Sequence, residues 1–243
     1  MEFRIADTFT DSLTRLTGDE QKAVKTTAFD LQINPASPGM SFHKLDKVKD
    51  KAFWSVRVGS DIRLIVHKSD TSLLLCYVGH HDKAYDWAER RKLETHPKTG
   101  AAQLVEMRET VKEIIVPVYG QTELPAAPKP AADSRPIFGG ASDDELLGYG
   151  VPTEWINDVK KATEVTLLAL TDHLPAEAAE ALLELATGGK PRVSPPAVAA
   201  TNPFDHPDAQ CRFRVMTNVE ELQRALDLPW EKWTVFLHPE QRQ

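Results

Sequence analysis

The fold of this chain is decided by residues 53–87, which read FWSVRVGSDIRLIVHKSDTSLLLCYVGHHDKAYDW. Apolar and polar side chains alternate along residues 54–58, which is the pattern of a half-buried strand. Two apolar runs follow, at 64–66 and 73–78, with a polar turn between them, and Gly-Ser-Asp at 59–61 is a second turn. We therefore predict three consecutive antiparallel strands joined by short turns.

Polar side chains gather where the third strand leaves this predicted sheet. The strand ends at Gly79, and it is followed by His80, His81, Asp82, Lys83 and Tyr85. Arg57 and Arg63 lie on the two strands beside it. Two guanidiniums and two imidazoles at one end of a sheet are chemically suited to hold a phosphate group.

These residues resemble the core of the RelE/ParE toxin superfamily, small proteins of which many cut messenger RNA on the ribosome. The resemblance extends over residues 3–94 and rests on Arg57, on Arg63 after a Gly-containing turn, and on Val78-Gly79-His80-His81. It implies an α+β fold, with a RelE/ParE-like antiparallel sheet and two N-terminal helices. Family nucleases often carry a Tyr or His near the end of this region; Tyr85 lies two residues short of that position, and Trp87 lies nearer to it. Non-cleaving members share the scaffold, so the resemblance implies the fold and leaves the activity open.

The residues around this core have the matching order of elements. We expect a strand at 3–5, a helix capped by Thr8, a helix capped by Thr17 with Glu20, a strand at 40–45 and, after the three strands, a helix at 82–93. Thr17 and Glu20 have the spacing of a capping box, in which each side chain binds the backbone amide of the other residue. A strand, two helices and then a run of strands is an α+β order. We place this first domain at residues 1–96.

After residue 96 the composition changes, and four further segments follow. They are a helix and Pro/Ala-rich linker at 97–141, a small all-α module at 142–189, a second linker at 190–207 and a strand–helix segment at 208–243. Within them we expect a helix at 101–115, helix caps at Ser142 and Asn218, helices that start at Thr153 and Thr163, and a strand at 211–216. Pro- and Ala-rich runs without a core pattern are typical of exposed linkers.

The end of the chain carries a second resemblance. Leu237-His238-Pro239-Glu240-Gln241-Arg242 is similar to the Q motif that opens the motor of UvrD-like, superfamily 1 helicases, and the whole layout resembles the N-terminal region of bacterial members. The resemblance implies that Gln241 binds an adenine edge, which an amide can match as donor and acceptor. A fortuitous tail is the alternative. No G-x-x-x-x-G-K-[ST] occurs in the chain, so we expect no cofactor, ATPase or helicase activity in it, and ATP with magnesium only in a longer parent protein.

Composition and charge narrow the class of protein. No apolar run approaches the roughly 18 residues of a membrane span, and the N-terminus lacks the apolar core of a signal peptide, so we expect a cytoplasmic protein. Cys76 and Cys211 lie far apart without metal-ligand spacing, which indicates reduced thiols and no metal site. Residues 1–98 hold 16 Lys and Arg against 14 Asp and Glu, a charge of +2, whereas the remainder holds 13 against 22, a charge of −9. A nucleic-acid surface is therefore expected in the first part, although a mixed solvated surface explains the small excess equally well.

The candidate nucleic-acid contacts are the basic residues of the first domain, Lys44, Lys47, Lys49, Lys51, Arg57, Arg63 and Lys83. Such residues bind nucleic acid by neutralising phosphates. The alternative for the lysine stretch is a solvated loop, because Asp46 and Asp50 interrupt it. The alternative for Arg63 is a salt bridge to Asp61 or Asp82.

Three functions fit these residues. The first is an accessory or regulatory nucleic-acid-binding region, for DNA or RNA, that serves a UvrD-like motor in cis. The second is a RelE-like endoribonuclease with His81 or His80 as general acid or base, Arg63 and Arg57 on the phosphate, and Tyr85 assisting; exposed polar residues at a strand end are the alternative for the histidines. The third is a domain that docks on the ribosome or an antitoxin-like protein. We expect the first, because of the acidic balance, the fusion layout and the missing Tyr.

Overall fold

The computed structural model describes residues 1–34, 41–111, 135–193 and 202–227. The chain divides into two compact units. The first combines Met1–Leu93 with the segment that begins at Pro207, and the second is Glu94–His206. The Q-motif-like end and the greater part of both Pro/Ala-rich runs lie outside the described residues.

The first unit is built on a mixed, mostly antiparallel sheet. Its strands are β1 (Glu2–Ala6), β2 (Phe42–Lys44), β3 (Phe53–Val58), β4 (Ile62–Lys68), β5 (Ser72–His80) and β8 (Phe213–Val215), in the spatial order β2-β3-β4-β5-β1-β8. Neighbours from β2 to β5 are antiparallel, as are β1 and β8, whereas β1 runs parallel to β5. The three consecutive antiparallel strands are confirmed as β3, β4 and β5. The fold expectation is confirmed to the extent that the chain is mixed α/β with a mostly antiparallel sheet.

One face of the sheet, the core face, is covered by helices α1 (Asp7–Thr14), α2 (Gly18–Ile33) and α9 (Val219–Asp227). The buried residues that meet there include Val56, Val58, Leu64 and Val66 from the strands and Phe9, Leu13, Val24, Leu31 and Leu222 from the helices. Side chains alternate along a strand, so Ser55, Arg57 and Arg63 lie on the opposite face. Burial of one face therefore decides which residues the other face presents.

The helix caps agree with the sequence in part. Thr17 and Glu20 form the predicted capping box at the start of α2. The prediction that Thr8 caps α1 was wrong, because Ala6 is the cap residue. The Thr8 hydroxyl donates instead to the Cys76 carbonyl, at 2.6 Å.

Helix α3 (His81–Glu89) lies on the opposite face, called the α3 face below. The Trp87 ring stacks on Tyr77 of β5 with 4.9 Å between ring centroids, and the Tyr85 hydroxyl lies 3.2 Å from Ser55 Oγ of β3. The predicted helix at 82–93 ends early, because β6 (Arg91–Thr95) begins directly after it. The Leu93 amide donates to the Asp50 carboxylate at 3.0 Å, a tertiary bond that competes with the helical ladder.

A β-bulge in β5 sets which of its side chains reach the α3 face. The pairing with β4 shifts by one residue and skips Cys76. This extra residue lets Leu75 join Val78 in the core, while Tyr77 and Gly79 remain on the α3 face.

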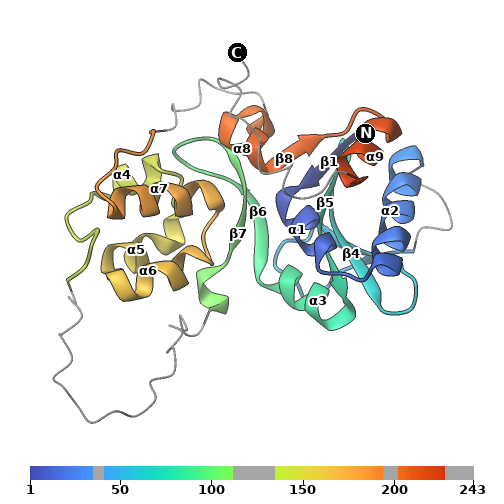
Figure 1. The fold of residues 1–243 in the computed structure, drawn as a ribbon, viewed down its shortest axis with the longest axis horizontal. Helices are drawn as coiled ribbons and strands as arrows, with labels where there is room; N and C mark the ends of the chain where they lie inside the picture. Colours follow the sequence, from blue (N-terminus) through green and yellow to red (C-terminus); the bar gives the residue numbers. More distant parts are fainter. Residues whose placement is uncertain (35–40, 112–134, 194–201, 228–243) are drawn as a thin grey trace, which may run out of the picture. The chain divides into compact units, whose positions relative to one another are not determined.

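The C-terminal strand–helix segment, expected as a separate lead-in to a motor, completes the first unit. In Figure 1, β8 and α9, coloured orange to red, return beside the blue β1. The Met216 amide donates to the Phe3 carbonyl at 2.8 Å, and Lys25 of α2 pairs with Asp227 of α9 at 2.9 Å. The strand predicted at 211–216 is shorter than expected, because helix α8 (Pro207–Arg212) takes its first residues. The Asn218 cap of α9 is confirmed by a 2.7 Å bond from the Glu221 amide.

The second unit contains a helical module and most of a hairpin, whose first strand begins at the end of the first unit. Strands β6 and β7 (Ala102–Glu106) pair, and the helices are α4 (Asp143–Gly148), α5 (Ile156–Lys161), α6 (Glu164–Thr171) and α7 (Ala176–Ala186). Trp155 is fully buried in their core, and its Nε1 donates to the Glu106 carbonyl at 2.7 Å. The caps at Ser142 and Thr163 are confirmed, and Thr153 begins a 3₁₀ helix that leads into α5.

The prediction of a helix at 101–115 was wrong for its first residues, which form β7. The small and apolar residues of β7 are buried on both faces of the strand. The Gln103 side chain donates to the Gly150 carbonyl at 3.0 Å and to Glu177 at 2.7 Å, so contacts with the module select the strand.

Candidate functional site

Two arginines face each other across neighbouring strands of the first unit. Arg57 on β3 is directly opposite Arg63 on β4, and Arg63 is directly opposite Gly79 on β5. Like charges in directly opposite positions destabilise a sheet. This arrangement therefore suits an anion that offsets both charges.

Backbone carbonyls orient the two guanidiniums. Arg57 Nε donates to the Gly59 carbonyl at 2.9 Å, and Arg63 Nη1 donates to the carbonyls of Ile62 at 2.9 Å and Ser60 at 3.3 Å. Among the described residues, no carboxylate lies within ion-pair distance of either guanidinium. Each guanidinium therefore keeps further N–H donors for a ligand.

The turn between the arginines contributes a carboxylate that is already engaged elsewhere. Gly59 has φ of +67°, a left-handed conformation that favours glycine. Asp61 accepts from the His80 ring, 2.7 Å away, and from the His81 amide, and these bonds hold the pKa of Asp61 below its ordinary value. Asp61 therefore pairs with His80. It attracts the Arg63 guanidinium electrostatically, but the two groups are not within ion-pair distance.

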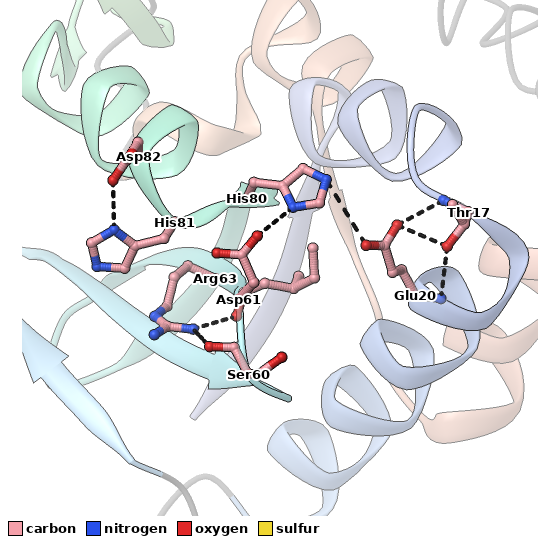
Figure 2. Close-up of polar contacts among 9 residues, drawn as sticks. Thr17, Glu20, Ser60, Asp61, Arg63, His80, His81 and Asp82 are labelled. Carbon is pink, nitrogen blue, oxygen red and sulfur yellow. Dashed lines mark hydrogen bonds and ion pairs between the residues drawn. The ribbon is translucent and has the colours of Figure 1, made fainter.

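The two histidines, expected to act at one site, point in different directions. Figure 2 shows His80 turned toward α2, between Asp61 and Glu20, and His81 turned the other way toward Asp82. His80 Nε2 lies 3.9 Å from Glu20 Oε1. The Thr17 amide and hydroxyl hold the pKa of Glu20 below its ordinary value. His80 thus connects the α2 cap to the β3–β4 turn.

His81 and Tyr85 lie together on α3. Their ring centroids are 4.4 Å apart, and His81 Nδ1 lies 2.9 Å from Asp82 Oδ1. The Tyr85 hydroxyl reaches Ser55, which shares a face of β3 with Arg57. The structure therefore brings His81 and Tyr85 to the α3 face, where Arg57 and Arg63 lie.

The predicted lysines do not gather around the arginines. Lys44 is opposite Trp54 in the register and belongs to the core-face side of the sheet, with its ammonium 5.8 Å from the Trp54 ring centroid. Lys47, Lys49 and Lys51 are exposed in the loop before β3, and Lys51 Nζ donates to the Asp46 carbonyl at 2.7 Å. Lys83 is exposed on α3.

Sequence reasoning missed two residues of the α3 face, Ser55 and Tyr77. Tyr77 lies within the apolar run 73–78, which hides it among core residues. Its period-two spacing from Gly79 was the available signal. Trp87, considered as a substitute for the family Tyr, is 8% exposed and packs against Tyr77 and Phe53.

Cys76 is buried, which raises the pKa of its thiol, and Cys211 is partly buried; neither forms a disulfide with a described residue. No group of His, Cys, Asp and Glu in the described ranges could hold a metal ion. Within the same ranges, no helix combines the length and apolar character that a membrane crossing requires. Gln241 lies outside the described residues.

Comparisons with known proteins give little further guidance. No family model matches the sequence, and no curated protein matches it. One solved structure with a partial similarity is the RelB–RelE antitoxin–toxin complex from Methanococcus jannaschii. The match has 19% identity and a TM-score of 0.30, and it covers 34% of this chain and 95% of that chain. The similarity is weak and partial, so the RelE/ParE and UvrD-like resemblances remain predictions from the sequence.

Proposed function

We propose that the first unit binds the phosphate backbone of a nucleic acid through Arg57 and Arg63. The observation that carries this proposal is their direct cross-strand pairing without a carboxylate partner among the described residues. A guanidinium offers several N–H groups in a fixed plane and binds phosphate oxygens bidentately. A bound phosphate would offset the repulsion between the two charges.

Binding of this kind has a measurable signature. Each neutralised phosphate releases counterions, so the logarithm of the binding constant falls linearly with that of salt concentration. The test is fluorescence anisotropy with labelled single-stranded RNA, single-stranded DNA and duplex DNA between about 50 and 200 mM salt. Arg57→Gln with Arg63→Gln should weaken binding about tenfold or more and flatten the salt slope.

Matched variants on the other side of the sheet provide the control. Lys44→Gln removes one positive charge from the same unit, on the core-face side. An equal loss from Lys44→Gln and from either arginine substitution would indicate a diffuse charge effect and contradict the proposal. Absence of binding to every probe at low salt would also contradict it.

The proposed setting is an accessory role beside a UvrD-like motor, with ATP and magnesium held by that motor. This setting rests on the resemblance of residues 237–242, including Gln241, and of the overall layout. Docking on the ribosome or an antitoxin-like protein likewise remains a prediction of the RelE/ParE resemblance.

A ribonuclease is the second candidate, and the position of His81 favours it. An imidazole titrates near neutral pH and can move the proton of a 2′-hydroxyl, while guanidiniums stabilise the charge that develops on the phosphate. His81 contacts Tyr85 on the α3 face, whereas His80 is engaged by Asp61. Cleavage of labelled RNA that is lost in His81→Ala and kept in His80→Ala would support this function. Intact RNA with and without ribosomes would contradict it.

A further inference from the structure

The Tyr77 ring leans over the strand position that is in line with the two arginines. Arg57, Arg63 and Gly79 occupy directly opposite positions on β3, β4 and β5. A Cβ built on Gly79 would lie 3.1 Å from Tyr77 Cε1 and 3.5 Å from Tyr77 Oη. The hydroxyl edge of the Tyr77 ring therefore lies over Gly79, on the strand next to Arg63. Neighbouring strands are about 4.8 Å apart, so donors on three strands span about 10 Å.

The Tyr77 ring is held firmly, but its hydroxyl has no hydrogen-bond partner among the described residues. The ring stacks on Trp87 with 4.9 Å between centroids and 11° between planes. The side chain is partly exposed, and its hydroxyl makes no hydrogen bond to any residue that the structure describes. By contrast, the Tyr85 hydroxyl lies within bonding distance of Ser55 Oγ, at 3.2 Å. A phenol fixed by stacking with a free hydroxyl is preorganised for a ligand.

The Tyr77 ring can occupy this position because Gly79 has no side chain. A contact of 3.1 Å is tighter than a real Cβ accepts without movement of its neighbour. A Cβ at 79 would require the ring to move by a few tenths of an ångström, and a longer side chain would require a larger movement. The bulge at Cys76 further separates Tyr77 from the core residue Leu75, although both lie in one apolar run.

We propose that Tyr77 is a third donor of the phosphate site, with its hydroxyl bonded to an oxygen of the phosphodiester that Arg57 and Arg63 bind. This inference rests on the proposed function. The hydroxyl is neutral, so it adds affinity without adding to counterion release. As a neutral donor on a third strand, it fixes where along the arginine pair the phosphate lies.

The experiment compares Tyr77→Phe, Gly79→Ala and their combination by the same anisotropy titrations. Tyr77→Phe keeps the Trp87 stack and removes only the hydroxyl, and it should weaken binding about two- to tenfold, the range of one neutral hydrogen bond. The salt slope should not change. Gly79→Ala displaces the ring by a few tenths of an ångström and should weaken binding by no more than this factor. The double variant should lose no more than Tyr77→Phe alone, because both substitutions act on the same contact. Tyr149→Phe in the second unit is the control for loss of a phenol.

The outcomes separate this inference from the proposed function. If the arginine variants lose binding while Tyr77→Phe binds like the wild type, the inference fails and the proposed function stands. If the arginine variants and Tyr77→Phe all bind like the wild type, the proposed function fails and the inference with it. Additive losses in the double variant, or a flatter salt slope in Tyr77→Phe, would also overturn the role of the hydroxyl. Unchanged circular dichroism of Tyr77→Phe would show that its loss of affinity is not a loss of fold.

Discussion

The arginine pair makes a prediction about stability that is independent of any ligand. Arg57 and Arg63 are directly opposite on β3 and β4, and like charges in that arrangement destabilise a sheet by about 0.2–1 kcal/mol. Because Arg57 is exposed, the repulsion should fall in the lower half of this range. Removing either charge should therefore relieve a measurable strain in the free protein.

A double-mutant cycle isolates this repulsion. Arg57→Gln loses a bond to the Gly59 carbonyl, and Arg63→Gln loses a bond to the Ile62 carbonyl. The cycle with both substitutions cancels these losses and leaves the coupling between the two charges. Native-state hydrogen exchange of the β3 and β4 amides is the assay, because it reports the local free energy of opening in the first unit.

The coupling should be repulsive at low salt and should disappear near 1 M salt, where the screening length is about 3 Å. Arg57→Lys keeps the charge and should retain the repulsion. A coupling of zero, an attractive coupling, or one that salt does not change would refute the reasoning. If the double variant is more stable than the wild type without ligand but binds nucleic acid more weakly, the arginine pair favours binding at the expense of stability.

Three further predictions concern the scaffold. Burial, with repulsion from Asp7 added, raises the pKa of Asp11 from 3.8 to about 6, so ionisation of this carboxyl destabilises the folded state as pH rises from about 4 to 6. After allowance for partial exposure, Asp11→Asn should raise the free energy of unfolding by about 1–2 kcal/mol at pH 7. Below about pH 4 the variant should be no more stable than the wild type, and urea unfolding at both pH values is the measurement. Asp50→Ala should lower the free energy of unfolding in urea by about 1–3 kcal/mol, because the Asp50 carboxylate accepts bonds from the Leu93 and Ala52 amides. Asp46→Ala is the control and should leave the free energy of unfolding nearly unchanged. Burial by itself raises the pKa of Asp50, but bonds from His67 and these amides outweigh it and lower the pKa, so the contribution of Asp50 should be present above pH 4 and lost as pH falls. Gly59→Ala should cost about 1 kcal/mol in thermal unfolding, because φ at this position is +67°; an unchanged melting temperature would contradict it.

The sequence by itself determined the elements whose signals are local. The β3–β5 meander follows from alternation and turn residues within 53–87. The caps at Thr17, Ser142 and Asn218 follow from spacings of three residues. Arg57 and Arg63 could be placed on neighbouring strands because a short turn fixes the register between them.

Tertiary structure alone decided the features that depend on distant contacts. β8 lies beside β1 although about 200 residues separate them in the chain, and no local pattern specifies such a pair. Residues 102–106 form a strand because the hairpin partner and the buried module outweigh their helical spacing. His80 and His81 are adjacent in sequence, yet their side chains point in different directions. His80 contacts Asp61 and Glu20, whereas His81 is the first residue of α3.

Tyr77 shows the limit of sequence reasoning most clearly. In an apolar run every residue looks like core, and only the register says which face each side chain takes. The bulge at Cys76 changes that register within the run, and it depends on pairing with β4 rather than on any residue nearby in sequence. The position of the Tyr77 hydroxyl over Gly79, directly opposite Arg63 in the register, is therefore a property of the assembled sheet.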